Sequence, residues 1–490
     1  MTTKTVFNLD ALAKNALLER GFIPDFPPAV VEETEAATEP SFPLSQYDAK
    51  DLREMLWFSL DNDDSRDLDQ LSYAEKLFNG EYKIYVAIAC VDILVKKNSA
   101  IDNRAANNTT SIYTPTKVFP MLPEKFSTGL TSLNPNDDRF SIVFEGQLTT
   151  DGNLQSYSVY LAYVRNQAKL AYDNISDWLD KKIPIPEKVK GIKGLEEQIR
   201  LQDSIAQVLA KKRHTQGALS LDTIEPHTIL SDGVPIGIDL MPKNRGRLLI
   251  ENFMIVANTI SAKYASDHQL PFFRRVVVAP KRWDKIIEIA KKYLIDLPST
   301  PDSIALEKFL LQRREADPVS FPDLSLAIIK MLGSGEYRVF YPGKESPGHF
   351  GLALRDYTHS TAPNRRFPDL IVQRILLASI QKSEMPYSNH ELEALALHCT
   401  KKEDDADKVE RKMRKSAAAL VLSKDIGKEF EGIVTGAGEK GTWVRILKPP
   451  VEGKLVKGTE AVDVGDRIQV RLLNTDVING FIDFEKVTSS

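Results

Sequence analysis

Five aspartates lie within nine residues of the stretch SLDNDDSRDLDQLSYAE (59–75), which overlaps the end of the apolar run MLWFSL (55–60). Asp67 and Asp69 are two positions apart, so their side chains leave an extended backbone on the same side. Asp61 closes the apolar strand and can turn back towards them. Converging carboxylates repel one another unless divalent cations lie between them. Hard oxygen ligands favour magnesium or manganese, and two such ions about 3.5–4 Å apart can support phosphodiester hydrolysis.

An isolated aspartate cluster can equally be a solvated turn that binds nothing. A calcium loop of the EF-hand type does not fit, because the sixth position from Asp61 is Arg66, where that loop requires glycine. The cluster by itself therefore leaves two alternatives, a divalent-metal site and a solvated turn. The rest of the chain has to distinguish them.

The segments that would position these carboxylates have the patterns of a mixed chain of strands and helices. Alternating apolar residues predict strands at 82–95 and 140–164, with a turn at Asp151–Gly152 inside the second range. Apolar residues at helical spacing predict helices at 194–214, 247–266 and 367–381.

The two ends of the chain differ in composition from the middle. Residues 1–22 predict one short amphipathic helix, and the stretch rich in Pro and Glu at 24–43 is typical of a linker. After a charged helix at 404–425, short strands separated by Gly-rich turns predict a small all-β barrel of about 65 residues. We therefore expect an N-terminal arm (1–46), a large mixed unit (47–424) and a barrel (425–490).

Composition sets outer limits on function. The 490 residues carry 64 Lys and Arg against 68 Asp and Glu, so the overall charge does not by itself indicate nucleic-acid binding. The only cysteines, Cys90 and Cys399, cannot build a disulfide framework or a cysteine zinc site. The apolar runs are too short to span a bilayer, and the N-terminus lacks the apolar core of a signal peptide. We expect a cytoplasmic protein without membrane contact.

Five stretches, in this order along the chain, resemble the ribonuclease II / ribonuclease R family, whose catalytic unit is the RNB domain. They are LDNDDSRDLDQ (60–70), SIYTPTKVFPMLPEKFSTGLTSLNP (111–135), KKRHTQGALSLDTIE (211–225), IENFMIVANTISAKY (250–264) and HFGLALRDYTHSTAPNRRFPDLIVQRIL (349–376). The C-terminal barrel resembles the S1-type OB fold that follows the RNB domain in this family. The resemblance implies an α+β fold, with a mixed sheet and helices in the RNB domain and an OB-fold barrel after it.

The resemblance also implies an activity. Members are processive 3′→5′ exoribonucleases that hydrolyse single-stranded RNA to nucleoside 5′-monophosphates with magnesium, for which manganese can substitute. Asp61, Asp67 and Asp69 match three of the four metal-site aspartates, and Gln70 stands at the fourth. Arg365 matches the catalytic arginine, whose guanidinium can clamp a phosphate and neutralise charge in the transition state. We expect single-stranded RNA as the partner of a monomer with no stable protein partner.

RNA contacts are implied for five further residues. Tyr113 matches a tyrosine that stacks on the terminal nucleotide, although a core tyrosine is the alternative. Tyr357, His359 and Arg366 flank Arg365 and are expected to line the site, with a purely structural role as the alternative for the histidine. Trp443 in the barrel is expected to stack on RNA bases. The basic stretch RKMRK (411–415) on the preceding helix could meet RNA that descends from the barrel.

Gln70 is the departure from the family pattern with the largest consequence. Its neutral amide offers one carbonyl oxygen, so it can be at best a weaker metal ligand than aspartate. Either three carboxylates still hold metal, helped by Asp63, Asp64 or a substrate phosphate, or the chain is a catalytically impaired RNA-binding protein. The first alternative is favoured here, because this chain resembles shorter members of the family that carry the same SRDLDQ stretch.

Other departures affect RNA binding. Leu221 stands near a position where many bacterial members carry a phenylalanine that clamps the bases, which predicts a looser grip on the RNA end. Cys90 and Asn252 replace an aspartate and a glutamate of the family pattern, and Cys90 is expected to be core. About 45 residues precede the RNB-like part of this sequence, so we expect it to lack the tandem cold-shock domains of typical members.

Overall fold

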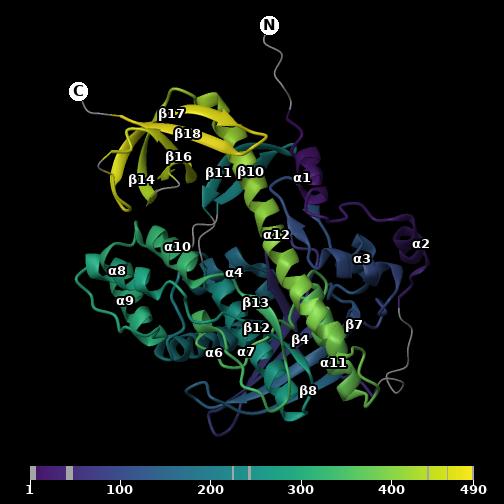
Figure 1. The fold of residues 1–490 in the computed structure, drawn as a ribbon. Coiled ribbons are helices and arrows are strands. Elements are labelled where there is room, and N and C mark those ends of the chain that lie inside the picture. The colour runs from purple at the N-terminus through teal and green to yellow at the C-terminus, as the bar shows by residue number, and fades with distance from the viewer. Residues whose placement is uncertain are drawn as a thin grey trace.

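A computed structural model describes residues 7–39, 48–222, 226–240, 244–438, 441–460 and 462–487 (Figure 1). The expected boundary at 46/47, and residues 1–6 and 40–46 of the expected N-terminal arm, lie outside the described residues. Within the described parts the fold is α+β, with a mixed sheet followed by a closed C-terminal barrel, which confirms the expected fold class.

The large mixed unit is built on a seven-stranded sheet with the order β1-β8-β7-β4-β3-β2-β9. Its strands are β1 (Lys50–Asp51), β2 (Phe58–Asp61), β3 (Gln70–Lys76), β4 (Tyr82–Ala89), β7 (Asp138–Leu148), β8 (Leu154–Arg165) and β9 (Ala168–Ala171). The pairs β1·β8 and β2·β9 are parallel, and the other neighbours are antiparallel. Because β2 ends at Asp61 and β3 begins at Gln70, the aspartate-rich loop lies at one end of the sheet.

The strand period divides apolar side chains between the two faces of the sheet. Ile84, Val86 and Ile88 of β4 belong to the main core, whereas Tyr85 and Ala87 belong to a smaller core around Trp57. The predicted turn at Asp151–Gly152 is confirmed between β7 and β8, where Gly152 has a φ of +81°.

The remaining strands form small sheets and the barrel. They are β5 (Ile112–Tyr113), β6 (Val118–Phe119), β10 (Pro226–Ser231), β11 (Val234–Leu240), β12 (Phe272–Val276), β13 (Glu336–Phe340), β14 (Glu429–Gly438), β15 (Gly441–Ile446), β16 (Val451–Lys457), β17 (Arg467–Asp476) and β18 (Phe481–Lys486). The barrel closes in the order β14-β15-β16-β18-β17.

The helices are α1 (Leu9–Leu18), α2 (Pro28–Ala36), α3 (Ala100–Asn108), α4 (Tyr172–Leu179), α5 (Glu187–Lys190), α6 (Leu195–Thr215), α7 (Arg245–Asp267), α8 (Trp283–Lys292), α9 (Ser303–Ala316), α10 (Phe321–Leu332), α11 (Phe367–Ile380) and α12 (Asn389–Leu422). The predicted helices at 194–214, 247–266 and 367–381 correspond to α6, α7 and α11. Among the described helices none is both long and apolar enough to cross a membrane.

Helix α12 connects the two units. It runs along the large mixed unit and ends at the barrel (Figure 1). The helix begins at Asn389 rather than at the predicted residue 404, because Ser388 and Glu391 form a capping box there. Its length of 34 residues lets one helix contact the N-terminal helix α1, strand β13 and the barrel strand β17.

Two features were missed by sequence reasoning. Helix α2 lies inside the stretch expected as a linker, because Pro28 begins a helix without losing a hydrogen bond and Val30 packs into the main core. Helices α8, α9 and α10 form a separate helical subdomain with its own core around Trp283, Phe309 and Phe321.

Candidate active site

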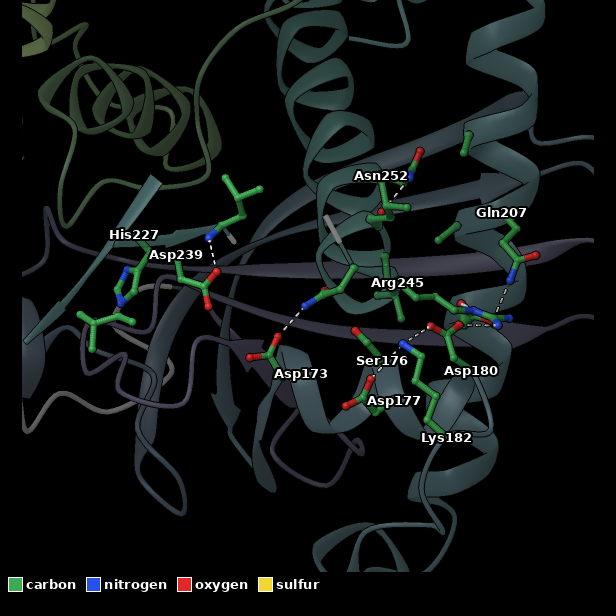
Figure 2. Close-up of a pocket in the computed structure, with 18 residues that line it drawn as sticks. Asp173, Ser176, Asp177, Asp180, Lys182, Gln207, His227, Asp239, Arg245 and Asn252 are labelled. Carbon is green, nitrogen blue, oxygen red and sulfur yellow. Dashed lines mark hydrogen bonds and ion pairs between the residues drawn. The ribbon is translucent and has the colours of Figure 1, made fainter. Parts of the chain in front are cut away.

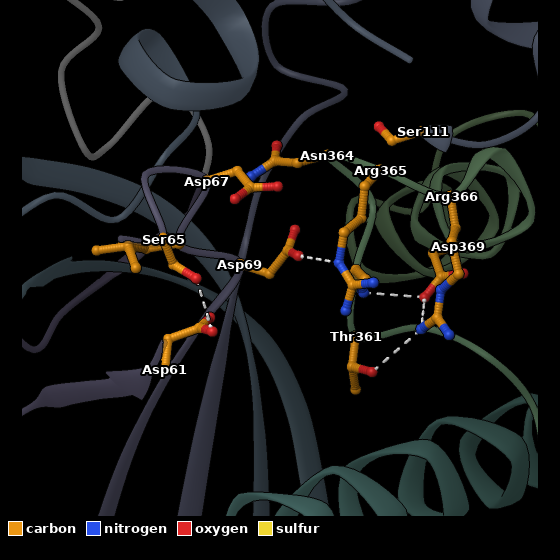
Figure 3. Close-up of polar contacts among 12 residues, drawn as sticks. Asp61, Ser65, Asp67, Asp69, Ser111, Thr361, Asn364, Arg365, Arg366 and Asp369 are labelled. Carbon is orange, nitrogen blue, oxygen red and sulfur yellow. Dashed lines mark hydrogen bonds and ion pairs between the residues drawn. The ribbon is translucent and has the colours of Figure 1, made fainter. Parts of the chain in front are cut away.

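Asp61 lies at the end of β2 and faces its own loop. Its Oδ1 atom accepts hydrogen bonds from the Asn62 amide (2.7 Å) and from the Ser65 hydroxyl (2.9 Å) (Figure 3). These contacts hold the start of the loop against the strand end. The carboxylate remains only half-buried.

Asp69 is the buried acid of the cluster, with a relative exposure of 2%. The Arg365 Nε atom donates to its Oδ2 atom at 2.9 Å, while its Oδ1 atom is buried without a hydrogen-bond partner among the described residues (Figure 3). Burial raises the pKa of Asp69 to about 7, although Arg365 opposes this shift. A buried carboxylate oxygen without a partner is costly unless a cation or ligand meets it.

Tyr113 connects Asp67 with helix α12. Its hydroxyl donates to Asp67 Oδ2 at 3.4 Å, and its backbone amide donates to Glu410 Oε1 at 2.8 Å. The tyrosine side chain is 41% exposed, so it is not a core residue. Burial raises the pKa of Asp67, and it raises the pKa of Tyr113, which keeps the phenol protonated.

Arg365 is held by the loop that precedes α11. The Arg365 carbonyl accepts from the Ser111 amide (2.9 Å), and the Asn364 side chain accepts from the Thr131 hydroxyl (2.6 Å). Asp369 in the first turn of α11 closes the loop, because its Oδ1 atom accepts from both the Ala362 amide (2.9 Å) and Arg366 (2.7 Å). Burial alone would lower the pKa of Arg365, but Asp69 and its neighbours raise it, so the guanidinium is charged.

The donor set fits a hard divalent cation by its chemistry, but the side chains do not enclose one. In the described parts of the chain, no group of three or more His, Cys, Asp or Glu side chains is close enough together to hold a metal ion. Asp61 is turned towards Ser65, and Asp69 towards Arg365 (Figure 3). The unpartnered Oδ1 atom of Asp69 supplies the free ligand that such an ion needs.

Gln70 opens β3 directly after Asp69 and is 8% exposed. The strand period sends consecutive side chains to opposite sides, which places Gln70 on the side of Ala74 and the main core. Its assignment as a metal ligand stays a prediction.

Three of the other predicted residues, Tyr357, His359 and Arg366, make polar contacts with other protein side chains. Tyr357 is 8% exposed and accepts a hydrogen bond from Asn258 (3.3 Å), and His359 Nδ1 pairs with the Tyr337 hydroxyl (2.9 Å). Burial, together with nearby arginines, lowers the pKa of His359 well below its usual range, so its imidazole is neutral. Arg366 binds Asp369. Their predicted RNA contacts, and that of Trp443 in β15 of the barrel, stay predictions.

A cleft of about 760 Å³ lies beside the aspartate loop. Tyr113, Tyr172 and Arg247 line it together with Asn62, to which the Arg247 Nη2 atom donates at 2.6 Å. Arg414 of α12 also lines it. Two arginines and the exposed ring of Tyr113 therefore face the cleft, together with the carboxylates of Asp63, Asp64 and Asp173.

A second cavity, of about 820 Å³, adjoins the cleft through Asp173 and His227 (Figure 2). Several of its charged side chains pair with one another. Arg245 donates to both Asp203 oxygens at 2.7 Å, and Lys182 contacts Asp177 at 3.1 Å. Aspartates nevertheless outnumber lysine and arginine among the described residues of its lining, so the cavity does not suit a polyanion.

The remaining sequence departures have structural explanations. Cys90 is buried in the main core, as expected. Asn252 accepts from Arg213 Nε (3.1 Å) and donates to the Leu248 carbonyl (2.7 Å). Leu221 packs against the core of the helical subdomain.

Sequence reasoning missed three contacts that hold the site. Asp369 could have been suspected, since it is an acid in the first turn of a helix that follows an arginine pair. Glu410 and Arg247 gave no such signal, because charged residues on solvated helix faces look the same in sequence.

The loop that carries Leu221 is fixed to the helical subdomain by a buried acid. Glu307 of α9 accepts from the Ser220 amide (2.6 Å) and the Ser220 hydroxyl (2.6 Å), and it contacts His214 Nδ1 at 3.1 Å. The hydrogen bond to Glu307 raises the pKa of His214. Protonated His214 therefore stabilises the fold at low pH, and this contribution is lost as the pH rises through the raised pKa.

We expect His214→Asn to lower the melting temperature at pH 6 and to have a smaller effect at pH 9. Thermal melts of both proteins at the two pH values measure this difference. His390→Asn is the matched control, because His390 is exposed in the first turn of α12. A deficit of equal size at both pH values would contradict the role of the imidazolium.

Comparison with known protein families decides which class this site belongs to. The sequence signature described as the RNB domain matches residues 49–382. The chain belongs to the RNB family. The signature of the RNase II-type exonuclease C-terminal S1 domain matches residues 428–487, which cover the barrel.

Individual RNB relatives differ in length from this chain. Ribonuclease R 1 of Lactococcus lactis is 27% identical over 96% of this chain, which spans 60% of that relative. The RNase R of Mycoplasma genitalium, solved with ribose-methylated single-stranded RNA, superposes with a TM-score of 0.87 at 24% identity, covering 98% of this chain and 78% of that one. Yeast Ssd1, a pseudonuclease, shares the fold with a TM-score of 0.73 at 17% identity, covering 91% of this chain and 56% of that one.

Proposed function

We propose that this RNB protein is a hydrolytic 3′→5′ exoribonuclease that degrades single-stranded RNA to nucleoside 5′-monophosphates with a divalent metal, magnesium or manganese. The observation that carries the proposal is the contact between Arg365 and Asp69, with the second Asp69 oxygen free and buried. A guanidinium that could bind phosphate thus lies against a carboxylate that could bind metal, and Tyr113, which contacts the neighbouring Asp67, lines the cleft.

Arg365 would bind the scissile phosphate. Its Nε atom is used by Asp69, whereas its terminal nitrogens make no hydrogen bond among the described residues, and its side chain is 42% exposed. Two N–H groups of a guanidinium match two phosphate oxygens. Because the arginine is fixed by Asp69 and by the loop contacts, it needs little reorganisation as negative charge grows in the transition state.

Asp61, Asp67 and Asp69 would hold the metal, with Gln70 as a neutral contributor at most. A bound divalent cation would activate the attacking water and stabilise the leaving oxygen. The Tyr113 hydroxyl contacts Asp67, and Arg365 contacts Asp69, so each of these two carboxylates already lies beside a group proposed to bind the substrate.

Tyr113 would hold the terminal nucleotide, and its replacement should raise KM. We expect Tyr113→Leu to raise KM for a short oligoribonucleotide by about 5- to 100-fold, since stacking contributes about 1–3 kcal/mol per base. Tyr113→Phe is the matched control, because it keeps the ring and loses only the 3.4 Å contact to Asp67. A phenylalanine variant as defective as the leucine variant would assign the role to the hydroxyl instead.

A catalytically impaired RNA-binding protein is the second candidate. It is favoured by Gln70 at the fourth ligand position, and by the likeness in fold to a pseudonuclease. Degradation of a 5′-labelled single-stranded oligoribonucleotide with magnesium, manganese or EDTA separates the two. A ladder of products that shortens from the 3′ end only when metal is present supports the exoribonuclease. Binding without cleavage in every metal supports the impaired protein.

A further inference from the structure

Tyr113 is carried by a short hairpin of residues 112–119, the Tyr113 hairpin, in which β5 pairs with β6. Ile112 lies opposite Phe119, and Tyr113 lies opposite Val118. Strand alternation sends the two pairs to opposite faces. Ile112 and Phe119 are buried, whereas Tyr113 and Val118 are 41% and 46% exposed. Because an isolated two-stranded hairpin is at best marginally stable in water, the Tyr113 hairpin depends on the elements that pack against its buried face.

The buried face of the Tyr113 hairpin shares one hydrophobic core with the N-terminal helix α1 and with α12. Ile112 and Phe119 belong to the same cluster as Leu9 and Leu17 of α1 and Val409 of α12. Helix α1 lies beside α12 (Figure 1). Helix α1 is therefore one of the supports of the hairpin, although it is far from Tyr113 in sequence.

A side-chain hydrogen bond joins α1 to the turn of the hairpin. The Thr116 hydroxyl donates to Asp10 Oδ1 at 2.6 Å in partly buried surroundings. Hydrogen bonds to an ionised carboxylate are stronger than those between neutral groups. The same turn is closed internally, because the Lys117 carbonyl accepts from the Thr114 hydroxyl at 2.6 Å and from the Thr114 amide at 3.0 Å. Asp10 thus holds a closed turn that leads directly into the strand of Tyr113.

The hairpin has two other polar anchors, and both lie at its base. Glu410 of α12 accepts from the Tyr113 amide at 2.8 Å, and the Arg365 carbonyl accepts from the Ser111 amide at 2.9 Å. Within the described residues, the bond between Thr116 and Asp10 is the hydrogen bond that ties the turn at 114–117 to another element. The position of the turn therefore depends on Asp10 in a way that the base does not.

Helix α1 is itself fixed to the body of the protein just beyond its C-terminal end. Lys402 of α12 donates to the Gly21 carbonyl at 2.6 Å. The Asn108 side chain accepts from the Ile23 amide and donates to the Ile23 carbonyl, each at 2.9 Å. These contacts anchor the segment that follows α1 on α12 and α3, so the Asp10 carboxylate is carried by a helix whose end is held.

We propose that Asp10 is a positioning residue, which holds the turn of the Tyr113 hairpin and thereby places the Tyr113 ring for the terminal nucleotide. Helix α1 then sets the affinity for the RNA end through Tyr113. The inference rests on the proposed function, because it needs RNA in the cleft that Tyr113 lines. It concerns substrate binding rather than the chemical step, since Arg365 and Asp69 hold each other independently of α1.

Steady-state kinetics on an oligoribonucleotide of about 4 nucleotides tests this role. Asp10→Ala should raise KM about 3- to 10-fold, the range of one side-chain hydrogen bond, and leave kcat unchanged. Thr116→Val removes the other partner and should have the same effect, and the double variant should be no worse than either single variant.

Asp10→Asn separates the hydrogen bond from the charge. Asparagine keeps an oxygen that can accept from Thr116, so KM should return close to that of the unmodified chain. If Asp10→Asn is as defective as Asp10→Ala, the negative charge in the first turn of α1 is what matters, and the proposal is wrong.

A chain without the tyrosine ring shows whether Asp10 acts through Tyr113. In a Tyr113→Leu background, Asp10→Ala should change KM by less than about 2-fold. An equal rise of KM in both backgrounds would mean a general structural role and would overturn the proposal. Asp25→Ala is the matched control, because Asp25 is an exposed acid of the same N-terminal segment that pairs with Lys14 at 2.8 Å. It should leave KM unchanged.

Hydrogen exchange, which needs no RNA, separates this inference from the proposed function. Exchange of the amides at 111–119 should be faster in Asp10→Ala and Thr116→Val than in the unmodified chain, and unchanged in Asp25→Ala. If the chain does not shorten RNA in any metal, the affinity for the same RNA replaces KM, and a loss that requires Tyr113 keeps the role of Asp10 while the nuclease activity fails. If the chain shortens RNA and the Asp10 variants change neither KM nor exchange, the activity stands and the role of Asp10 is wrong.

Discussion

Asp69→Asn is expected to abolish RNA hydrolysis while RNA binding is retained. Asparagine has the shape of aspartate and can still accept the hydrogen bond from Arg365, but it removes the buried negative charge that a divalent cation requires. We expect the rate of mononucleotide release to fall by a factor on the order of 10³ or more. Rates are measured on a 5′-labelled single-stranded RNA, and affinity is measured on the same RNA.

Asp63→Asn is the comparison for this prediction, because it tests whether the exposed carboxylate on the same loop, which also lines the cleft, helps to hold the metal. Its rate should change little. Thermal melts show whether either variant is misfolded. If a folded Asp69→Asn protein is fully active, Asp69 is not a metal ligand. If Asp63→Asn loses most of the activity, the exposed carboxylate of Asp63 is a metal ligand in place of Gln70.

Arg365→Ala should lower kcat by about 10²- to 10³-fold, the usual loss when one preorganised donor to a developing negative charge is removed. The effect should fall mainly on kcat rather than on KM, because the guanidinium is fixed against Asp69 before the substrate arrives. Single-turnover degradation of the labelled RNA measures the chemical step directly.

Arg365→Lys separates charge from geometry. A lysine restores the positive charge but not the paired N–H donors, so partial recovery of the rate is expected. Arg355→Ala is the control, because Arg355 is exposed on the same segment. A change confined to KM in Arg365→Ala would mean that the arginine binds substrate and transition state equally, and its proposed role in the transition state would be wrong.

The local sequence was sufficient for the parts of the fold that depend on short-range periodicity. The alternation at 82–95 predicted a strand, of which β4 forms Tyr82–Ala89, and the apolar spacing at 247–266 predicted α7. Helix α2 was missed because a run of Pro and Glu is typical of a linker, and only burial of Val30 distinguishes it. The start of α12 was misplaced because the charged residues near 404 hide a helix that is capped at Ser388.

For the site, the spacing of Asp61, Asp67 and Asp69 by itself determined which residue types could meet a cation, and the order of the motifs determined the family. Only the tertiary structure decided which carboxylate is buried. Asp69 and Arg365 are 296 positions apart, and Tyr113 and Glu410 are 297 apart, yet each pair is in hydrogen-bond contact. The physical reason is that residue periodicity records only which side of an element is buried. The pairing of distant side chains follows from how α11 and α12 pack against the rest of the chain.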